Sequence, residues 1–531
     1  MFVLKSSAPP EPYLLRLAFL GISRFLPKFV LPQVRLFAEA SSRIPANASL
    51  ELEKESEEGK GEAKSLSRRI EKLARGESVA AAFQSWMGEG LPIHRGDVFH
   101  TINRLRKLKA TRRALEVMEW VIRERPYRPK ELDYAYLLEF TIKFHGISQG
   151  EALFSRTPSD FKSELLYNNL VLGCLDKGLI RLSLAYMKKM RELGHSISHL
   201  AFNRLITLHS SPGRKKSIPK ILTQMRADKV ARHVSTYNIL LKIEADDHNI
   251  DGLTRVFSEM TAEPNEVTYC ILAVAHAVAR LYAACEVYVE SIEKSMTGDN
   301  WSTLDILMIL YGRLGKAKDL ERTWSSIRAL PRIRTRSFLL AIEAFGRTGN
   351  LDRADEIWVE MASKKGLKST EQFNSMIGAQ CRNGAITRAT ALYKEMSGNG
   401  CKPNAITLRH LCLGCLKAGL VEEGVRTLEA GMDFPTSEKV RRSTPWLETT
   451  FAVMEVFAER GDVGMAEKLF FELRRRKYTR YTFVYNGLLK GYVKGKVYEA
   501  GFVRRMILGG SRPDSETYSL VKVMEEFRHG S

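Results

Sequence analysis

A repeat of about 35 residues runs through most of this 531-residue chain and constrains its fold more than any other feature. An aromatic residue precedes an asparagine at Tyr167-Asn168, Phe202-Asn203 and Tyr237-Asn238, so that these asparagines stand 35 residues apart. The register extends back to Ala135 and His100 and forward, in steps of 32 to 42 residues, to Cys270, Asp305, Leu339, Asn374, Arg409, Phe451, Asn486 and Ser519. A fixed period of this length indicates an array of similar structural units.

Each unit has the pattern of two helices joined by a tight turn. In residues 370–404, apolar residues recur at helical spacing on both sides of Asn383-Gly384. Gly384 permits the turn, and Pro403 lacks the backbone donor that a further helical turn would need. Because one helix pair cannot bury its apolar face alone, neighbouring pairs must stack. We therefore expect an all-α fold, a right-handed superhelical α-solenoid of about 12 to 13 helix-turn-helix repeats of about 35 residues.

The period also sets the expected domain boundaries. The repeat array is predicted over residues 96–514, with a partial C-terminal repeat at 515–531 and a divergent N-terminal helix pair at 65–95. Residues 46–64 precede them and include ELEKESEEGKGEAK, which carries six glutamates and neither aromatic nor β-branched residues. This composition predicts a flexible acidic linker, or at most an extended helix.

The first fifty residues differ from the rest of the chain. They contain six basic residues, two acidic residues and several serines, and their cations share one face of an apolar helical pattern. These features predict an organellar transit peptide at 1–45, with the mitochondrion favoured over the chloroplast. An ordinary amphipathic first helix and a membrane anchor are the alternatives, and frequent charges argue against a membrane-spanning helix.

Composition narrows the environment and the partners. Seven cysteines are scattered through the chain, which favours a reducing compartment without disulfides. Lys and Arg number 82 against 61 Asp and Glu, and the net charge of +21 favours polyanionic partners such as RNA, DNA or an anionic membrane. Charge alone does not choose among these partners.

The repeat resembles one known family. A 34-residue tetratricopeptide array is close in period, but its W-x2-L-G-x2-Y signature is missing. Aromatic-Asn openings and Pro-Asn or Pro-Asp endings instead resemble the pentatricopeptide repeat family, P class, over residues 96–531. The segment from Ser65 through Glu124 is also similar to a plant organellar subgroup of that family.

The resemblance implies that the fifth residue and the last residue of a unit jointly select one base of single-stranded RNA. Asparagine suits this role because its amide both donates and accepts hydrogen bonds. Carried over unit by unit, the implied base-reading pairs are Asn168 with Ser198, Asn203 with His233, Asn238 with Asn265, Asn374 with Asn404, and Asn486 with Asp514. The first matches a cytosine-preferring combination, the third and fourth match pyrimidine combinations, and the fifth matches a uracil combination. Asn203 with His233 fits no strong rule.

Other units depart from the family's pattern. Their pairs are Cys270 with Asn300, Asp305 with Arg334, Leu339 with Ser369, Phe451 with Tyr481, and His100 with Lys130. Leu339 and Phe451 cannot offer the expected hydrogen bonds. A long and highly selective RNA footprint is therefore not expected.

Other motifs support binding weakly and argue against catalysis. Basic clusters that could contact phosphates are Arg214-Lys215-Lys216, Lys439 with Arg441-Arg442, and Arg474-Arg475-Arg476-Lys477, although such clusters are more often a solvated face. His410, Cys412 and Cys415 have part of a zinc spacing, but no second cysteine pair lies nearby, so the thiols are interpreted as buried apolar groups. No phosphate-binding loop or deaminase motif is present, and we expect no enzyme activity, cofactor or metal.

Two functions remain open from the sequence. The first is an organellar RNA-binding adaptor that acts in transcript processing, stabilisation, splicing or translation. The second is a structural scaffold subunit of the mitochondrial ribosome or another ribonucleoprotein, which the number of degenerate units favours. In either case we expect a monomer that does not bind membranes.

Overall fold

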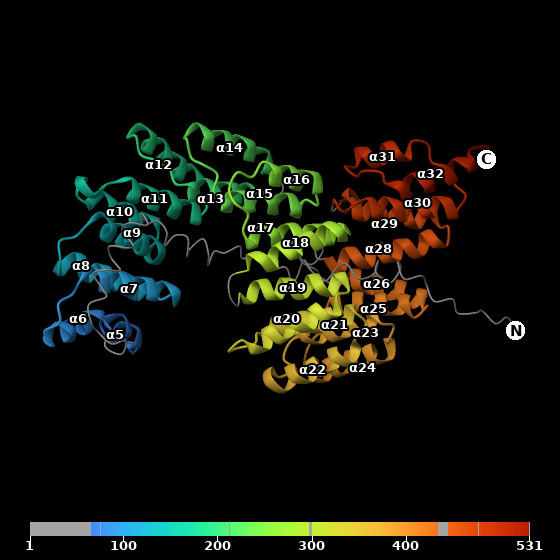
Figure 1. The fold of residues 1–531 in the computed structure, drawn as a ribbon, viewed down its shortest axis with the longest axis horizontal. Helices are drawn as coiled ribbons and strands as arrows, with labels where there is room; N and C mark the ends of the chain where they lie inside the picture. The colour runs from blue at the N-terminus through green and yellow to red at the C-terminus, as the bar shows by residue number, and fades with distance from the viewer. Residues whose placement is uncertain are drawn as a thin grey trace. The chain divides into compact units, whose positions relative to one another are not determined.

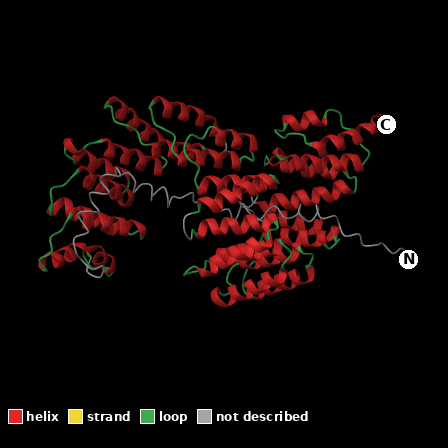
Figure 2. Ribbon diagram, viewed as in Figure 1, coloured by secondary structure: helices red, strands yellow, loops and turns green. Residues whose placement is uncertain are grey.

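The fold is helical throughout the described part of the chain. The computed structural model describes residues 65–74, 76–211, 213–296, 300–433, 444–475 and 477–529, and these contain helices and no strand (Figure 2). The predicted transit peptide at 1–45 and acidic linker at 46–64 lie outside these residues. Within them, no helix combines the length and hydropathy that crossing a bilayer would need.

The chain divides into two compact units after Ile239, a residue of α15 (Val234–Asp246). The preceding unit contains α5 (Leu66–Lys72), α6 (Val79–Gly88), α7 (Arg95–Lys107), α8 (Thr111–Glu124), α9 (Glu131–His145), α10 (Ile147–Arg156), α11 (Glu164–Asp176), α12 (Ile180–Glu192), α13 (His199–His209) and α14 (Ile218–Ala227).

The unit that starts at Leu240 continues the alternation of first and second helices (Figure 1). It contains α16 (Ile250–Ser258), α17 (Glu266–Val278), α18 (Tyr282–Ser295), α19 (Trp301–Leu314), α20 (Ala317–Ala329), α21 (Thr335–Arg347), α22 (Leu351–Lys365), α23 (Thr370–Arg382), α24 (Ile386–Gly398), α25 (Ala405–Lys417), α26 (Val421–Asp433), α28 (Thr444–Glu459), α29 (Val463–Arg475), α30 (Thr482–Lys494), α31 (Phe502–Leu508) and α32 (Ser515–Glu525). Short 3-10 segments are η3 (Ser159–Phe161), η4 (Lys215–Ser217), η5 (Tyr478–Arg480) and η6 (Glu526–His529).

The turn inside each repeat has the backbone that the glycine pattern predicts. Gly384, between α23 and α24, has a φ of +74°, in the left-handed region that glycine adopts without steric cost. Some repeats place other residues at the same point: His248, Arg280 and Lys496 have φ values of 56°, 62° and 53°. The turn geometry is therefore kept even where the residue is unfavourable for it.

Adjacent repeats pack through their first helices, which confirms the predicted α-solenoid. In the unit that starts at Leu240, each first helix contacts the first helix of the following repeat. The series of contacting helices is α17, α19, α21, α23, α25, α28, α30 and α32. The approach is close at Gly346 of α21, because a Cβ added there would lie 2.5 Å from the Cβ of Ala379 on α23. Ala354, Ala389 and Ala466 on the second helices are fully buried, as their small size predicts.

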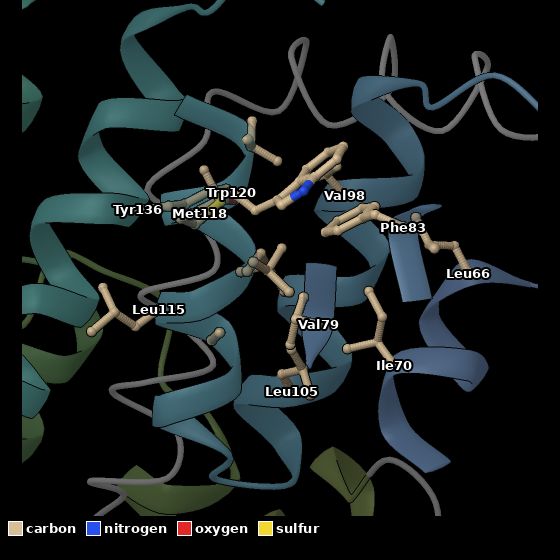
Figure 3. Packing of buried hydrophobic residues seen from close by; sticks show 14 of the residues in the cluster. Leu66, Ile70, Val79, Phe83, Val98, Leu105, Leu115, Met118, Trp120 and Tyr136 are labelled. Carbon is tan, nitrogen blue, oxygen red and sulfur yellow. The ribbon is translucent and has the colours of Figure 1, made fainter. Parts of the chain in front are cut away.

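The divergent helix pair α5 and α6 packs on the first repeats of its own unit. Figure 3 shows Leu66, Ile70 and Phe83 directed toward side chains of α7 and α8. Phe83 stacks on Trp120 with ring centroids 4.0 Å apart. Arg113 of α8 donates hydrogen bonds to carbonyl oxygens at the end of α5, including that of Glu71 at 2.8 Å. These bonds satisfy carbonyls that a helix end leaves without partners.

Distant repeats also meet within the unit that starts at Leu240. The His248 Nδ1 lies 2.8 Å from the Tyr481 hydroxyl, although 233 residues separate them in sequence. Ion pairs join Lys477 to Asp247 at 3.1 Å and Arg512 to Asp251 at 3.0 Å. The α16 region of this unit is therefore in contact with the residues that precede α30 and α32.

Candidate functional site

The predicted pair Asn374 and Asn404 lies at a polar junction between α23 and α25. Asn404 caps α25, because its Oδ1 accepts the backbone N–H groups of Ile406 and Thr407 at 3.0 and 3.2 Å. The same oxygen accepts the Nδ2 of Asn374 at 3.3 Å. Thr407 accepts the Asn404 backbone N–H at 3.0 Å and donates to the Asn374 Oδ1 at 2.8 Å. The three side chains form one network across the junction.

The junction between α30 and α32 repeats this network with an acid. Thr517 accepts the Asp514 backbone N–H at 3.1 Å and donates to the Asn486 Oδ1 at 2.7 Å. The Nδ2 of Asn486 donates to the Asp514 Oδ1 and to the Glu516 Oε2, both at 3.0 Å. Burial opposes ionisation of Asp514, but hydrogen bonds from the Thr517 N–H and the Asn486 amide hold its pKa below the usual value.

The Asn168 and Ser198 pair has a different arrangement. Here the Asn168 Oδ1 accepts the Ser198 backbone N–H at 2.8 Å, while its Nδ2 donates to the carbonyl oxygens of Glu164 and Ser196, both at 3.1 Å. Ala201 stands where the other junctions have threonine. The amide therefore directs its oxygen, instead of its nitrogen, toward the residue that caps the next helix.

The remaining predicted pairs are less regular. Asn203 donates from Nδ2 to the Ser235 hydroxyl at 3.0 Å, and His233 lies 3.0 Å from the same hydroxyl. The rings of His233 and His199 are 5.0 Å apart, and burial with the neighbouring histidine lowers the pKa of His199 to about 4. Asn238 is buried on α15.

Asn265, which was predicted to pair with Asn238, belongs to the other compact unit, where its Oδ1 accepts the Thr268 N–H and caps α17. All five fifth-position asparagines (Asn168, Asn203, Asn238, Asn374 and Asn486) have buried side chains.

Units that depart from the family's pattern use the same position for packing or ion pairing. Leu339 and Phe451 are buried, and Phe451 belongs to an apolar cluster. Asp305 is buried 3.8 Å from Arg336, and burial raises the pKa of this carboxyl. The Arg334 guanidinium lies 3.2 Å from the ring centroid of Trp301, an exposed residue at the start of α19. The side chains at these positions make their contacts within the protein.

Four basic residues at one register of successive repeats were not identified by the sequence analysis. Arg313, Arg347, Arg382 and Lys417 each stand eight residues after the fifth position, on α19, α21, α23 and α25. Glu343 lies between two of them, with Oε1 2.7 Å from Arg347 and 3.2 Å from Arg382. Burial opposes the charge on Glu343, but the two guanidinium groups lower its pKa to about 2. The period of 34 to 35 residues is the sequence signal that could have found this row.

The cysteine and histidine residues near His410 belong to the packed interior. Cys412 and Cys415 are buried, and burial raises the pKa of the Cys412 thiol to about 12. Burial, with Arg382 nearby, lowers the pKa of His410 to about 3. No group of three or more candidate ligands that could hold a metal ion occurs among the described residues.

The predicted basic clusters differ in their surroundings. Arg214 and Lys216 are exposed, and Lys477 is exposed while paired with Asp247. The cluster of Lys439 with Arg441 and Arg442 lies outside the described residues, as does Arg476.

The family models and the relatives that match this chain all belong to one family. The PPR repeat model matches residues 166–195 and 336–365, the PPR repeat family model matches 368–417, and the pentatricopeptide repeat domain model matches 186–247. A mitochondrial pentatricopeptide repeat-containing protein of Arabidopsis thaliana is 61% identical over 468 residues, which cover 88% of this chain and 88% of that protein. Another mitochondrial protein of the same name and plant is 26% identical over 429 residues, covering 80% of this chain and 70% of that protein.

Solved structures of the pentatricopeptide repeat protein PPR10 also match. One, in complex with an 18-nt psaJ RNA element, is similar over 87% of this chain and 77% of that chain, with 15% identity and a TM-score of 0.39. The other, from maize, is similar over 88% of this chain and 66% of that chain, with 19% identity and a TM-score of 0.32. This chain thus spans about two thirds of the length of the maize structure.

Proposed function

The chain belongs to the pentatricopeptide repeat family, as a plant mitochondrial member of its P class, and we propose that it binds single-stranded RNA at its polar junctions. The observation that carries the proposal is the pair of matching networks at Asn374 and Asn486, each of which joins an amide to the cap of the next helix. Such amides have the donors and acceptors that an unpaired base edge requires. Each junction would read one base.

Phosphate attraction would supply much of the affinity. The net charge of +21 and exposed cations such as Arg214 and Lys216 make the protein attractive to a polyanion. The RNA strand would be held by these charges and ordered by base contacts, which would keep it from refolding or from nuclease attack. Transcript processing, stabilisation, splicing and translation are the steps on which such binding would act.

The test measures binding of a pyrimidine-rich single strand at several salt concentrations. We expect affinity to fall steeply with salt, because each phosphate contact releases counterions. Replacing Asn374→Ala and Asn404→Ala together should weaken binding, since both sides of one junction are lost. Asn399→Ala is the matched control, because Asn399 is an exposed asparagine at the end of α24. Equal affinity of the double variant and wild type would contradict base reading at this junction.

A scaffold role in the mitochondrial ribosome or another ribonucleoprotein is the second candidate. It is favoured by fifth positions such as Leu339 and Phe451, which are buried and apolar and therefore offer no hydrogen bond to a base. Sedimentation of a mitochondrial extract separates the two functions. Stoichiometric migration with a ribosomal subunit would support the scaffold, and substoichiometric association with one or two transcripts would support the adaptor.

A further inference from the structure

We propose that Thr407 and Thr517 are positioning residues that hold the base-reading amides of the preceding repeats in one orientation and thereby contribute to base specificity. This inference rests on the proposed function. Both threonines are buried, and each stands at the third position of a helix whose cap contacts an asparagine of the repeat before it. Neither was singled out from the sequence.

The orientation at Asn374 follows from the backbone. Because the Asn404 backbone N–H donates to the Thr407 hydroxyl, that hydroxyl directs its own proton elsewhere, and its shorter contact of 2.8 Å is to the Asn374 Oδ1. The Asn404 Oδ1 must be an oxygen because it accepts two backbone N–H groups, so it faces the Nδ2 of Asn374. The amide is thus fixed at both ends, with one N–H of Nδ2 left for a base acceptor.

Asn486 is held in the same orientation at the second junction. Thr517 donates to its Oδ1, and Asp514 accepts from its Nδ2. Glu516 accepts the other N–H and also pairs with Lys490 at 2.6 Å. A base acceptor at this junction would therefore replace Glu516 as the partner of the amide.

The Asn168 junction supplies the contrast within the same chain. It has Ala201 in place of threonine, and its amide is reversed, with both N–H groups on backbone carbonyls and the oxygen on the Ser198 N–H. The group left for a base at Asn168 is a lone pair of Oδ1, whereas at Asn374 it is an N–H. Junctions with threonine should therefore favour a base that presents a carbonyl acceptor, and the junction without it should favour a base that presents an amino donor.

A threonine is not sufficient by itself. Thr236 occupies the same third position after Asn203, yet its hydroxyl and the Asn203 Oδ1 are both buried without a hydrogen-bond partner. The residue before that helix is His233, where the other two junctions have Asn404 and Asp514. The orienting network therefore needs an asparagine or aspartate cap as well as the threonine.

The experiment selects RNA from a random single-stranded pool with the full chain and compares the enriched motifs of wild type, Thr407→Val and Thr517→Val. Valine has the shape of threonine without the hydroxyl. Each variant should reduce base preference at one position of the motif by about fivefold, the effect of one neutral hydrogen bond. The two affected positions should lie three nucleotides apart, because Asn374 and Asn486 are three repeats apart. Thr407→Ser should restore the preference.

Thr303→Val is the matched control, because Thr303 is buried at the same register but follows Cys270, which has no amide to orient. It should leave every position of the motif unchanged. If the two valine variants lower thermal stability or overall affinity but keep every base preference, the threonines act only as helix caps and the inference is overturned. A wild-type protein that binds RNA without enriching any motif overturns base reading, and the inference with it. A wild-type protein that binds no RNA overturns the proposed function.

Discussion

Replacing Glu343→Gln should destabilise the protein in a manner that depends on pH. Glu343 is buried between Arg347 and Arg382, and its pKa of about 2 lies below the ordinary 4.5. A lowered carboxyl pKa means that its contribution to the free energy of unfolding is complete above about pH 5 and is lost as the pH falls through 4.5 toward 2. From these two pKa values, the wild-type protein should lose about 2 kcal/mol through this residue between about pH 7 and pH 3.

The variant keeps the shape of the side chain and removes its charge. Because two buried cations then lose their carboxylate, the free energy of unfolding at about pH 7 should fall by about 3–5 kcal/mol. The difference between wild type and variant should narrow by about 2 kcal/mol at about pH 3, because the carboxyl is protonated in the unfolded chain at that pH while it stays ionised in the folded protein. Urea unfolding followed by circular dichroism at the two pH values measures both effects.

Glu356→Gln is the matched control, since Glu356 pairs with Arg353 but its side chain is 63% exposed. An exposed ion pair contributes about 0–1 kcal/mol, so this variant should differ little from wild type at either pH. A Glu343→Gln difference that stays the same from about pH 7 to pH 3 would refute the argument. It would mean that Glu343 carries no charge-dependent stability.

Two further predictions concern the backbone of the repeats. Gly346→Ala should lower the free energy of unfolding by about 1–3 kcal/mol, because the added Cβ would lie 2.5 Å from the Cβ of Ala379; an unchanged urea midpoint would show that α21 and α23 can separate freely. Lys496→Gly should instead raise the free energy of unfolding by about 0.5–1 kcal/mol, because Lys496 is exposed and its φ of 53° is a left-handed conformation that glycine adopts more easily. A lower melting temperature of the variant would contradict this expectation.

The period predicted the fold because it depends on local rules. Apolar spacing, turn glycines such as Gly384 and stops such as Pro403 act within one repeat, and their recurrence leaves stacking as the remaining step. The contact of His248 with Tyr481 could not be predicted in this way. It joins residues 233 positions apart and depends on how small rotations add up over many repeats, which no local pattern encodes.

The sequence predicted which residues lie together at the candidate junctions, but not their burial or their hydrogen bonds. The period located Asn374 and Asn404 as neighbours, and the structure places them 3.3 Å apart. It did not reveal that these asparagines are buried, or that Thr407 completes their network. A residue's hydrogen-bond partners depend on side-chain geometry across two repeats, whereas the pattern of one repeat fixes only its own helices.

Burial of the junction asparagines is compatible with a role in binding and helps to explain their presence. Repeats with Leu339 or Phe451 at the same position still form the helix pair and still pack, so the fold itself does not require an amide there. A buried amide costs free energy unless its hydrogen bonds are satisfied. At Asn374 the oxygen and one N–H have partners, and at Asn486 the oxygen and both N–H groups have partners. The asparagine, the cap residue and the threonine thus add little to packing beyond what apolar residues would supply. They do fix the direction of the amide before any ligand binds. That preorganisation reduces the entropy lost on binding, which is the advantage that a base-reading group would need.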